Sequence, residues 1–342
     1  MKPIIPFALL GALLAVGAAD AAVTDPVGYI THAIAGGTVA SPGFTFVSST
    51  LVAADTFAGA STNSLAGGTT VSAPGIPAGL GADYYVEIKS GPSEGWWATL
   101  SGPPTGPSVA GTATVTSPFP AGLGVGTVFT IRKHQTIGGL FGANKPGLDP
   151  GLDLDSADEV QVLDNSTQNT SAYFYALAAD GAPVDGFYDG GGGDANGVVI
   201  EPGASVLIKR KFGGPTSFVS NGSVKVTKTQ VDIYVGDNWV STMRATGVTL
   251  GAMGLDTGNT STGVERGVDL NVDEFQLIAA DGATTNAYFA ADPVAAPGFA
   301  GWYDGGGADK NSLLIAEGQG GNVKRKFAGS AIWTVPAQPI AP

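Results

Sequence analysis

Two glycine-rich segments carry the residues best suited to chemistry. Carboxylates and an amide flank a run of glycines in each, and the candidate ligands are Asp189, Asp194 and Asn196 in one segment and Asp304, Asp309 and Asn311 in the other. Side-chain oxygens of this kind, completed by glycine carbonyls, suit Ca²⁺. The same residues also suit a β-turn, because Gly adopts positive φ and Asp or Asn accepts hydrogen bonds from turn amides. Both interpretations stay open, since the spacing is not that of an EF-hand loop.

A second acidic cluster precedes each of these segments. Its members are Asp149, Asp153, Asp155, Asp158 and Glu159, with a thinner counterpart of Asp269, Asn271, Asp273 and Glu274. Such dense carboxylates repel one another unless a cation or a basic side chain lies among them. A solvated loop is the alternative interpretation.

The sequence Lys-Arg-Lys occurs twice, at residues 209–211 and 324–326. In a strand, alternation places the arginine on one face and the two lysines on the other. We therefore expect Arg210 and Arg325 to form partly buried ion pairs with Asp158 and Asp273, or with the aspartates of the glycine-rich turns. The lysines would protect a strand edge, and an anion-binding site is the alternative.

Aromatic residues offer a surface on which a sugar could stack. The candidates are Trp96, Trp97, Trp239, Trp302, Tyr188 and Tyr303. Trp239 and Trp302 match Phe46 and Phe187 in a repeat described below, which favours core packing. Trp96 and Trp97 are adjacent and must lie on opposite faces of a strand. We therefore predict that one of them is exposed and contacts a polysaccharide ligand.

Catalytic groups are few. His32 and His134 are the only histidines, neither lies in a nucleophile or zinc motif, and there is no cysteine. We expect no enzymatic activity and no organic cofactor. A glycosidase with two distant carboxylates is an alternative, although no pair stands out in the sequence.

A long internal repeat sets the organisation of the chain. Residues 158–212 align without a gap with residues 273–327, and 22 of the 55 positions are identical. Upstream, residues 43–49 resemble 236–242 and residues 136–138 resemble 249–251. These two markers lie close together in the second copy and far apart in the first. The first copy is therefore predicted to be interrupted by an insert.

The predicted boundaries follow from this repeat. Residues 1–21 read as a signal peptide. The first β module comprises residues 22–51 and 135–214, and residues 52–134 form a small inserted β subdomain. Residues 215–335 form the second β module, with a junction at 215–222, and residues 336–342 form a loose tail.

Composition indicates an all-β protein. Gly numbers 53 and Pro 22, charged residues make up 13%, and short β-branched and aromatic runs are separated by turn residues. We predict two related antiparallel modules, each a β-sandwich or barrel-like sheet. The net charge of −13 argues against nucleic acid as a partner, and after the signal peptide we expect no membrane span.

Four phrases of the sequence resemble a known family. They are T-D-P-V-G-Y at residues 24–29, Y-V-E-I-K-S-G-P-S-E-G at 85–95, T-I-G-G-L-F at 136–141 and I-K-R-K at 208–211. In this order they resemble a family of exported, β-rich bacterial proteins of unknown function. The resemblance implies export and a β-rich fold, and supplies no mechanism.

The sequence thus favours an exported, non-enzymatic β protein. We expect a surface-structural or adhesive role, with self-association through strand edges. The location would be the cell surface, the periplasm or the extracellular medium. Carbohydrate binding is the main alternative and hydrolysis a weaker one.

Overall fold

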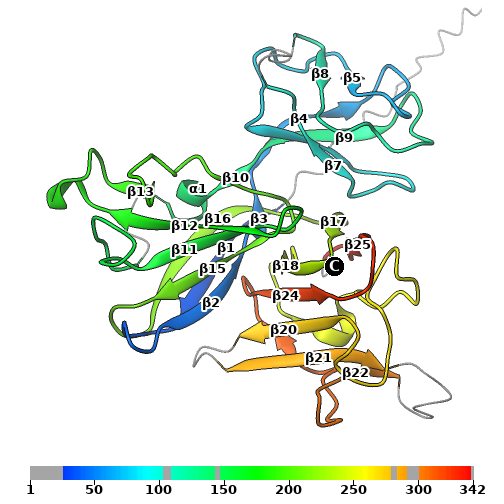
Figure 1. Cartoon of the computed structure of the whole chain (residues 1–342). Helices are drawn as coiled ribbons and strands as arrows, with labels where there is room; N and C mark the ends of the chain where they lie inside the picture. Colours follow the sequence, from blue (N-terminus) through cyan, green and yellow to red (C-terminus); the bar gives the residue numbers. More distant parts are fainter. Residues whose placement is uncertain (1–25, 103–108, 143–146, 279–282, 291–299, 340–342) are drawn as a thin grey trace, which may run out of the picture.

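The protein is built almost entirely from antiparallel β-sheets. A computed structural model describes residues 26–102, 109–142, 147–278, 283–290 and 300–339. Figure 1 shows three bodies: an upper one of strands β4–β9, and two lower ones. The predicted all-β fold is confirmed, and the sheets of the described residues are open, which favours the sandwich over the barrel-like alternative. Within the described residues no helix is long and apolar enough to cross a membrane. The predicted signal peptide lies outside these residues.

One lower body, which we call the first module, contains a five-stranded and a three-stranded sheet. The five-stranded sheet has the order β13 (Gly186–Asp189), β12 (Asn169–Ala176), β11 (Glu159–Asp164), β15 (Ser205–Arg210), β2 (Gly43–Ser48). The other has the order β1 (Val27–Ile34), β16 (Thr216–Val224), β3 (Leu51–Val52). The short pair β10 (Gln135–Thr136) and β14 (Val199–Ile200), helix α1 (Ile137–Phe141) and a 3-10 turn (Ala178–Asp180) complete it.

The other lower body, the second module, repeats this arrangement. Its five-stranded sheet has the order β18 (Gly236–Ser241), β24 (Gly320–Arg325), β20 (Glu274–Ile278), β21 (Thr284–Ala290), β22 (Gly301–Tyr303). β17 (Thr229–Ile233) pairs with β25 (Ala331–Val335), and β19 (Val248–Thr249) with β23 (Leu314–Ile315). A 3-10 turn (Leu250–Ala252) takes the place of α1. Each of these strands has a counterpart in the first module, and the residue pairings correspond.

The upper body is the insert. It has a four-stranded sheet of order β4 (Asp55–Ala60), β9 (Val128–Lys133), β6 (Tyr84–Ile88), β7 (Trp97–Thr99), and a pair β5 (Thr70–Ser72) and β8 (Thr112–Thr114). Its own apolar core includes Leu65, Val86 and Phe129. The predicted insert at residues 52–134 is thus a separate packing unit between β3 and β10.

The two modules contact each other reciprocally. Ser48 N–H donates to the Gly318 carbonyl at 2.9 Å, and its counterpart Ser241 N–H donates to the Gly203 carbonyl at 2.8 Å. Single β-bridges join Val47 to Gln319 and Ala204 to Val240, which are also counterparts. Such exchange of equivalent contacts is the signature of a two-fold, isologous interface.

Equivalent aromatic rings meet at the centre of this interface. Phe46 and its counterpart Trp239 lie edge to face, with centroids 5.5 Å apart. Leu163 and Leu207 are buried around them, and Ile278, the counterpart of Leu163, packs against the same cluster. The two rings therefore lie beside the pseudo-two-fold axis, and apolar burial at this point joins the modules.

In each module a buried aspartate accepts hydrogen bonds at the end of one strand: β15 in the first module and β24 in the second. Asp158, which is fully buried, accepts hydrogen bonds from the backbone N–H groups of Lys211 and Phe212 at 2.6 and 3.1 Å. Its other oxygen accepts from Asp149 N–H at 2.9 Å and lies 3.9 Å from the Arg210 guanidinium. The two oxygens of this carboxylate thus fix both the strand end and the loop before β11.

Asp273 does the same in the second module. It accepts from the N–H groups of Lys326 and Phe327, and Arg325 lies 3.4 Å from it. The expected pairing of Arg210 and Arg325 with these aspartates is therefore present. In the first module, Lys209 and Lys211 both reach Glu159, at 3.0 Å each, so these lysines are engaged in ion pairs.

Two segments differ from the sequence-based boundaries. Residues 216–222 of the segment expected to join the modules belong instead to β16, which pairs with β1 over residues 216–223, and Phe218 and Ser220 are buried on its inner face. The chain passes to the second module at residues 225–228. The described part of the tail is also held: Ala337 accepts a hydrogen bond from Arg244, and Gln338 accepts one from Ala245 N–H.

The buried aspartates give the first prediction. Asp158→Asn replaces an acceptor oxygen by a donor facing N–H groups, and leaves Arg210 without its buried partner. We expect the free energy of unfolding to fall by about 3–5 kcal/mol, measured by urea denaturation. Asp273→Asn should behave alike, whereas the exposed Asp155→Asn should change little. Equal stability of all three variants would contradict the assigned role.

Candidate functional site

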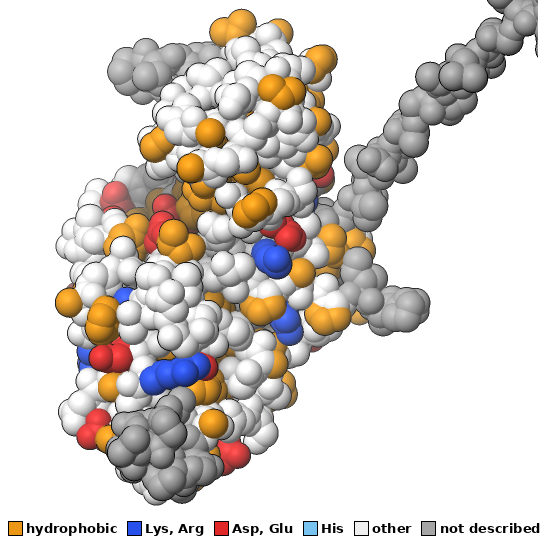
Figure 2. Space-filling view, turned by 90° about the vertical axis from the view of Figure 1, so that its right-hand side faces the viewer, with side chains coloured by type: hydrophobic (Ala, Val, Ile, Leu, Met, Phe, Trp, Pro, Cys, Tyr) orange, Lys and Arg blue, Asp and Glu red, His pale blue; other side chains and the backbone are white. Residues whose placement is uncertain are grey.

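A cleft of about 630 Å³ opens where the insert faces both modules. The insert contributes residues around β7, the first module contributes the turn between β11 and β12 and the β14–β15 segment, and the second module contributes β17. Figure 1 shows β7 directly above β17 and β25. On the face seen in Figure 2, the insert presents mainly apolar and uncharged side chains, and the charged ones gather below it.

Backbone contacts between the insert and β17 form one wall of the cleft. Gln230 N–H donates to the Gly95 carbonyl at 2.9 Å, and the Trp97 indole N–H donates to the Gln230 carbonyl at 3.0 Å. Gly95 has φ of +89°, and a Cβ there would lie 2.7 Å from the carbonyl carbon of Lys228. Only glycine permits this approach. The insert thereby satisfies the outer edge of β17.

A buried ion cluster fastens the insert to the segment that joins the modules. Glu87 on β6 lies 2.6 Å from the Lys225 ammonium, and both side chains are 1% exposed. The Arg132 guanidinium lies 3.5 Å from Glu87 and 2.8 Å from Asp55. Burial by itself raises the pKa of Glu87, but Lys225, Lys89 and Arg132 outweigh it, so the pKa is lowered. The ionised cluster therefore holds the insert over the cleft.

Trp96 and Trp97 both line the cleft, and both are half-buried. Trp96 packs against the insert core, 5.0 Å from the Phe119 ring. Trp97 faces the other way, edge-on to Tyr85 and His134. The adjacent pair thus occupies opposite faces as expected, but neither ring is fully exposed, because the insert core covers one and β17 the other. Tyr173 and Tyr234 add two further rings to the cleft.

Three carboxylates share the cleft with these rings: Asp164, Glu201 and Asp232. Glu201 and Asp232 are exposed residues, but neighbouring atoms of the cleft partly desolvate their carboxyl groups; this partial desolvation, followed by the charges of Asp164 and Asp232, raises the pKa of Glu201. Partial desolvation also raises the pKa of Asp232, although its hydrogen bond with Tyr234 acts in the opposite direction. The cleft therefore carries concentrated negative charge, which favours cationic or hydroxyl-donating groups and repels anions.

These carboxylates were not among the site residues expected from the sequence. The signal lay in the repeat: Glu201 aligns with Ala316, and the strand pairings match Asp232 with Ala33. Acidic side chains thus stand on one side of the pseudo-two-fold where alanines stand on the other. The difference shows that the two sides of the molecule are chemically distinct, and it could have been found by comparing the two copies position by position.

The glycine-rich segments form matching turns. Asp189 Oδ1 accepts from the N–H groups of Gly191 and Gly193 at 2.9 and 2.8 Å, and Asp194 Oδ1 accepts from Asn196 N–H. Asn196 Oδ1 in turn accepts from Phe187 N–H. Asp304, Asp309 and Asn311 repeat these bonds.

These turns take up several of the oxygens proposed as calcium ligands. Within the described ranges no group of three or more His, Asp or Glu side chains is placed to hold a metal ion. Calcium binding at the turns remains a prediction.

Both histidines are buried and neutral near pH 7. His32 lies 2.8 Å from the Ser220 hydroxyl and 3.2 Å from the Gly318 carbonyl, and burial lowers its pKa to about 4. His134 lies 3.1 Å from the Thr99 hydroxyl, and burial lowers its pKa to about 4 as well. Neither lines the cleft, so neither is placed to act on a ligand there.

Comparison with known proteins gives no match: no family model, no curated protein and no solved structure is significantly similar to this chain. The resemblance to exported β-rich proteins therefore remains a prediction. The cleft has to be interpreted from its own chemistry.

The ion cluster gives the second prediction. Glu87→Gln leaves Lys225 buried without its counter-charge, so we expect a loss of about 3–5 kcal/mol in unfolding free energy. Because the folded pKa of Glu87 is lowered, its contribution is full above the ordinary value of 4.5 and disappears as the pH falls through the lowered value. Urea denaturation across this range measures both effects. A double variant, Glu87→Leu with Lys225→Met, should regain part of the loss; a double variant worse than the sum of the singles would contradict the pairing.

The cleft carboxylates give the third prediction. The folded pKa of Glu201 lies above its unfolded value, so ionisation of Glu201 as the pH rises through this interval costs stability. Because Glu201 is exposed, solvent screens this cost, so Glu201→Gln should raise the melting temperature near pH 7 only slightly, by about 1 °C, and should have no effect below about pH 3, where the carboxyl is protonated in both states. Glu317→Gln, at an exposed residue outside the cleft, is the control. A lower melting temperature for Glu201→Gln near pH 7 would contradict the account.

Proposed function

We propose that this chain is an exported, non-enzymatic binding protein with an adhesive role, and that it binds a polysaccharide in the cleft between the insert and the two modules. The observation that supports this most is the combination of rings and carboxylates on a cleft of about 630 Å³. Aromatic faces pack on the apolar faces of sugar rings, and carboxylates accept hydrogen bonds from sugar hydroxyls.

The charge of the cleft selects among glycans. Asp164, Glu201 and Asp232 lie together in a chain of net charge −13. Uronic acids and sulfated sugars would be repelled. A neutral glycan or one containing free amino groups fits, because hydroxyls donate to carboxylates and ammonium groups pair with them.

Duplication is part of the proposal. We infer that the two modules arose from one ancestral β module and that the insert was added to the first. The matching strand pairings and the 22 identities support this. An added body beside one module accounts for a cleft that the insert bounds on one side. Export and an extracellular, cell-surface or periplasmic location rest on the signal-peptide prediction.

Hydrolysis is the second candidate. Glu201, with a raised pKa, lies among other carboxylates in the same cleft, which is the environment in which a carboxyl group serves as a general acid. Measuring soluble sugar after the protein is mixed with an insoluble polysaccharide separates the two functions, because a hydrolase would release sugar and a binding protein would not.

The fourth prediction tests the proposal. Purified protein beginning at residue 22 is mixed with insoluble chitin, cellulose and a uronic-acid polysaccharide gel, and the retained fraction is measured. We expect retention on chitin or cellulose and none on the acidic gel. Trp96→Ala should weaken retention about tenfold or more, since a stacked ring contributes on the order of 1–3 kcal/mol when buried.

Two controls accompany this assay. Leu314→Ala removes an exposed apolar side chain outside the cleft and should leave retention unchanged. Trp97→Phe keeps a ring but loses the bond to Gln230, which separates stacking from attachment of the insert. Retention that is unaltered in Trp96→Ala and in Glu201→Gln, with both variants folded by circular dichroism, would disprove glycan binding in this cleft.

A further inference from the structure

In the part of the chain that the structure describes, one of two strand edges related by the pseudo-two-fold is uncovered. Strand β17 is the outer strand of its sheet, and the insert covers its edge through Gly95 and Trp97. The counterpart of β17 is β1, because Ile34 pairs with Thr216 as Ile233 pairs with Ala331. No insert exists in the second module to cover β1. Among the described residues, the backbone of β1 pairs with β16 only, on one side.

The outward backbone groups of β1 follow from this equivalence. Gln230, whose N–H and C=O point away from β25 toward the insert, corresponds to Thr31. The N–H and C=O groups of Thr31 and of its alternate neighbours Tyr29 and Ala33 therefore point away from β16. They form a ready template for another extended strand.

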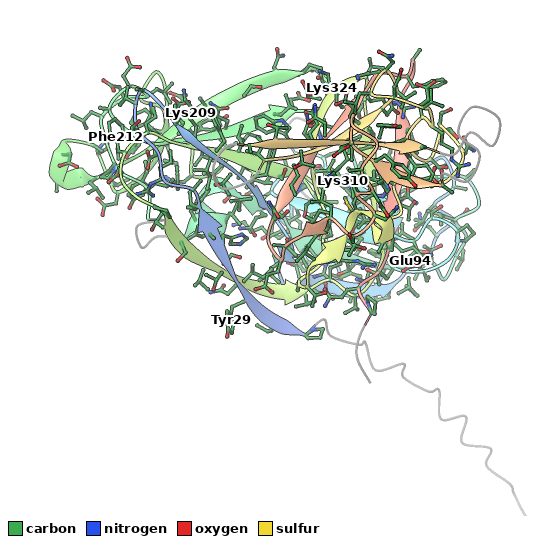
Figure 3. All side chains as sticks on the ribbon, turned by 90° about the horizontal axis from the view of Figure 1, so that it is seen from below. Tyr29, Glu94, Lys209, Phe212, Lys310 and Lys324 are labelled. Carbon is green, nitrogen blue, oxygen red and sulfur yellow. The ribbon has the colours of Figure 1, made fainter. Side chains whose placement is uncertain are left out.

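The edge lacks the features that normally prevent strand addition. β1 has eight residues and contains no proline, no bulge and no Asp, Glu, Lys or Arg. β16 contains none of these charged residues either. By contrast, β4 has a bulge and begins at Asp55, and β13 and β22 are short. On the outer face Val27 is 84% exposed, Tyr29 77% and Val219 56%. Figure 3 shows Tyr29 projecting from β1 at the outer side of the molecule.

Charge identifies the occupant. The chain has a net charge of −13, so most of its surface repels a second copy. The β1–β16 surface carries no Asp, Glu, Lys or Arg and is the face on which two copies meet without this repulsion. An antiparallel β1–β1 contact is self-complementary, as closed two-fold symmetry requires.

We infer that β1 pairs with β1 of a second copy of this chain, forming a continuous six-stranded sheet of order β3-β16-β1-β1-β16-β3 across a two-fold axis. Exposed alternate residues of one copy then face exposed alternate residues of the other. Two copies also place two clefts on one particle, which increases the apparent affinity for a polymeric ligand. The pairing itself does not depend on the glycan proposal.

Sedimentation velocity of the chain from residue 22, without glycan and over a range of concentrations, tests the inference. We expect a concentration-dependent dimer. Thr31→Pro removes an outward N–H in each copy and spares the bonds to β16, so the dissociation constant should rise at least about tenfold. Thr31→Val keeps the N–H and should leave the dimer intact.

Other outcomes overturn the inference. A wild-type chain that stays monomeric at its highest soluble concentration, or a Thr31→Pro variant that dimerises as the wild type does, would show that β1 is not the contact. If Thr31→Pro fails to fold by circular dichroism, Thr31→Lys decides instead, because a lysine from each copy would bring like charges together at the edge. A dimer that persists in that variant would equally refute β1 pairing.

Discussion

The contact between Phe46 and Trp239 is the interaction on which the arrangement of the molecule depends. These rings are equivalent residues of the two modules, and reciprocal bonds from Ser48 and Ser241 flank them. A two-fold contact between related but non-identical modules fixes two equivalent strand edges, β1 and β17, and one position for the body inserted between β3 and β10. The location of the cleft and the exposure of β1 both follow from it. Apolar contacts at the axis thus determine where the polar side chains of the cleft come together and which strand edge stays open.

The insert makes the two sides of this nearly symmetric molecule different. Glu87 and Lys225 are both almost completely buried, and their mutual charge compensation is what makes burial tolerable. The same attachment brings Gly95 and Trp97 onto β17, so the insert covers one edge and forms the roof of one cleft. The cleft carries Glu201 and Asp232, whose counterparts are Ala316 and Ala33. The residues that attach the insert and the residues that line the cleft therefore lie on the same side of the molecule.

Much of the fold was predictable from the sequence because repetition and alternation are local signals. The all-β class and the matching strands of the two modules follow from them, and the burial of Arg210 follows from its position between two lysines. The junction did not, since residues 215–222 look like a loop and become β16 only through pairing with β1. Glu201 and Asp232 were missed because their proximity is created by the meeting of three bodies. No local pattern encodes such a meeting.

Amide hydrogen exchange at Ser48 and Ser241, followed by NMR, tests the central two-fold contact most directly. Each N–H donates across the module interface and not within its own sheet. The account predicts that both amides exchange slowly and at similar rates, near those of the buried strands β15 and β24. Fast exchange at both positions, with the strands still protected, would mean that the modules are not joined in this way.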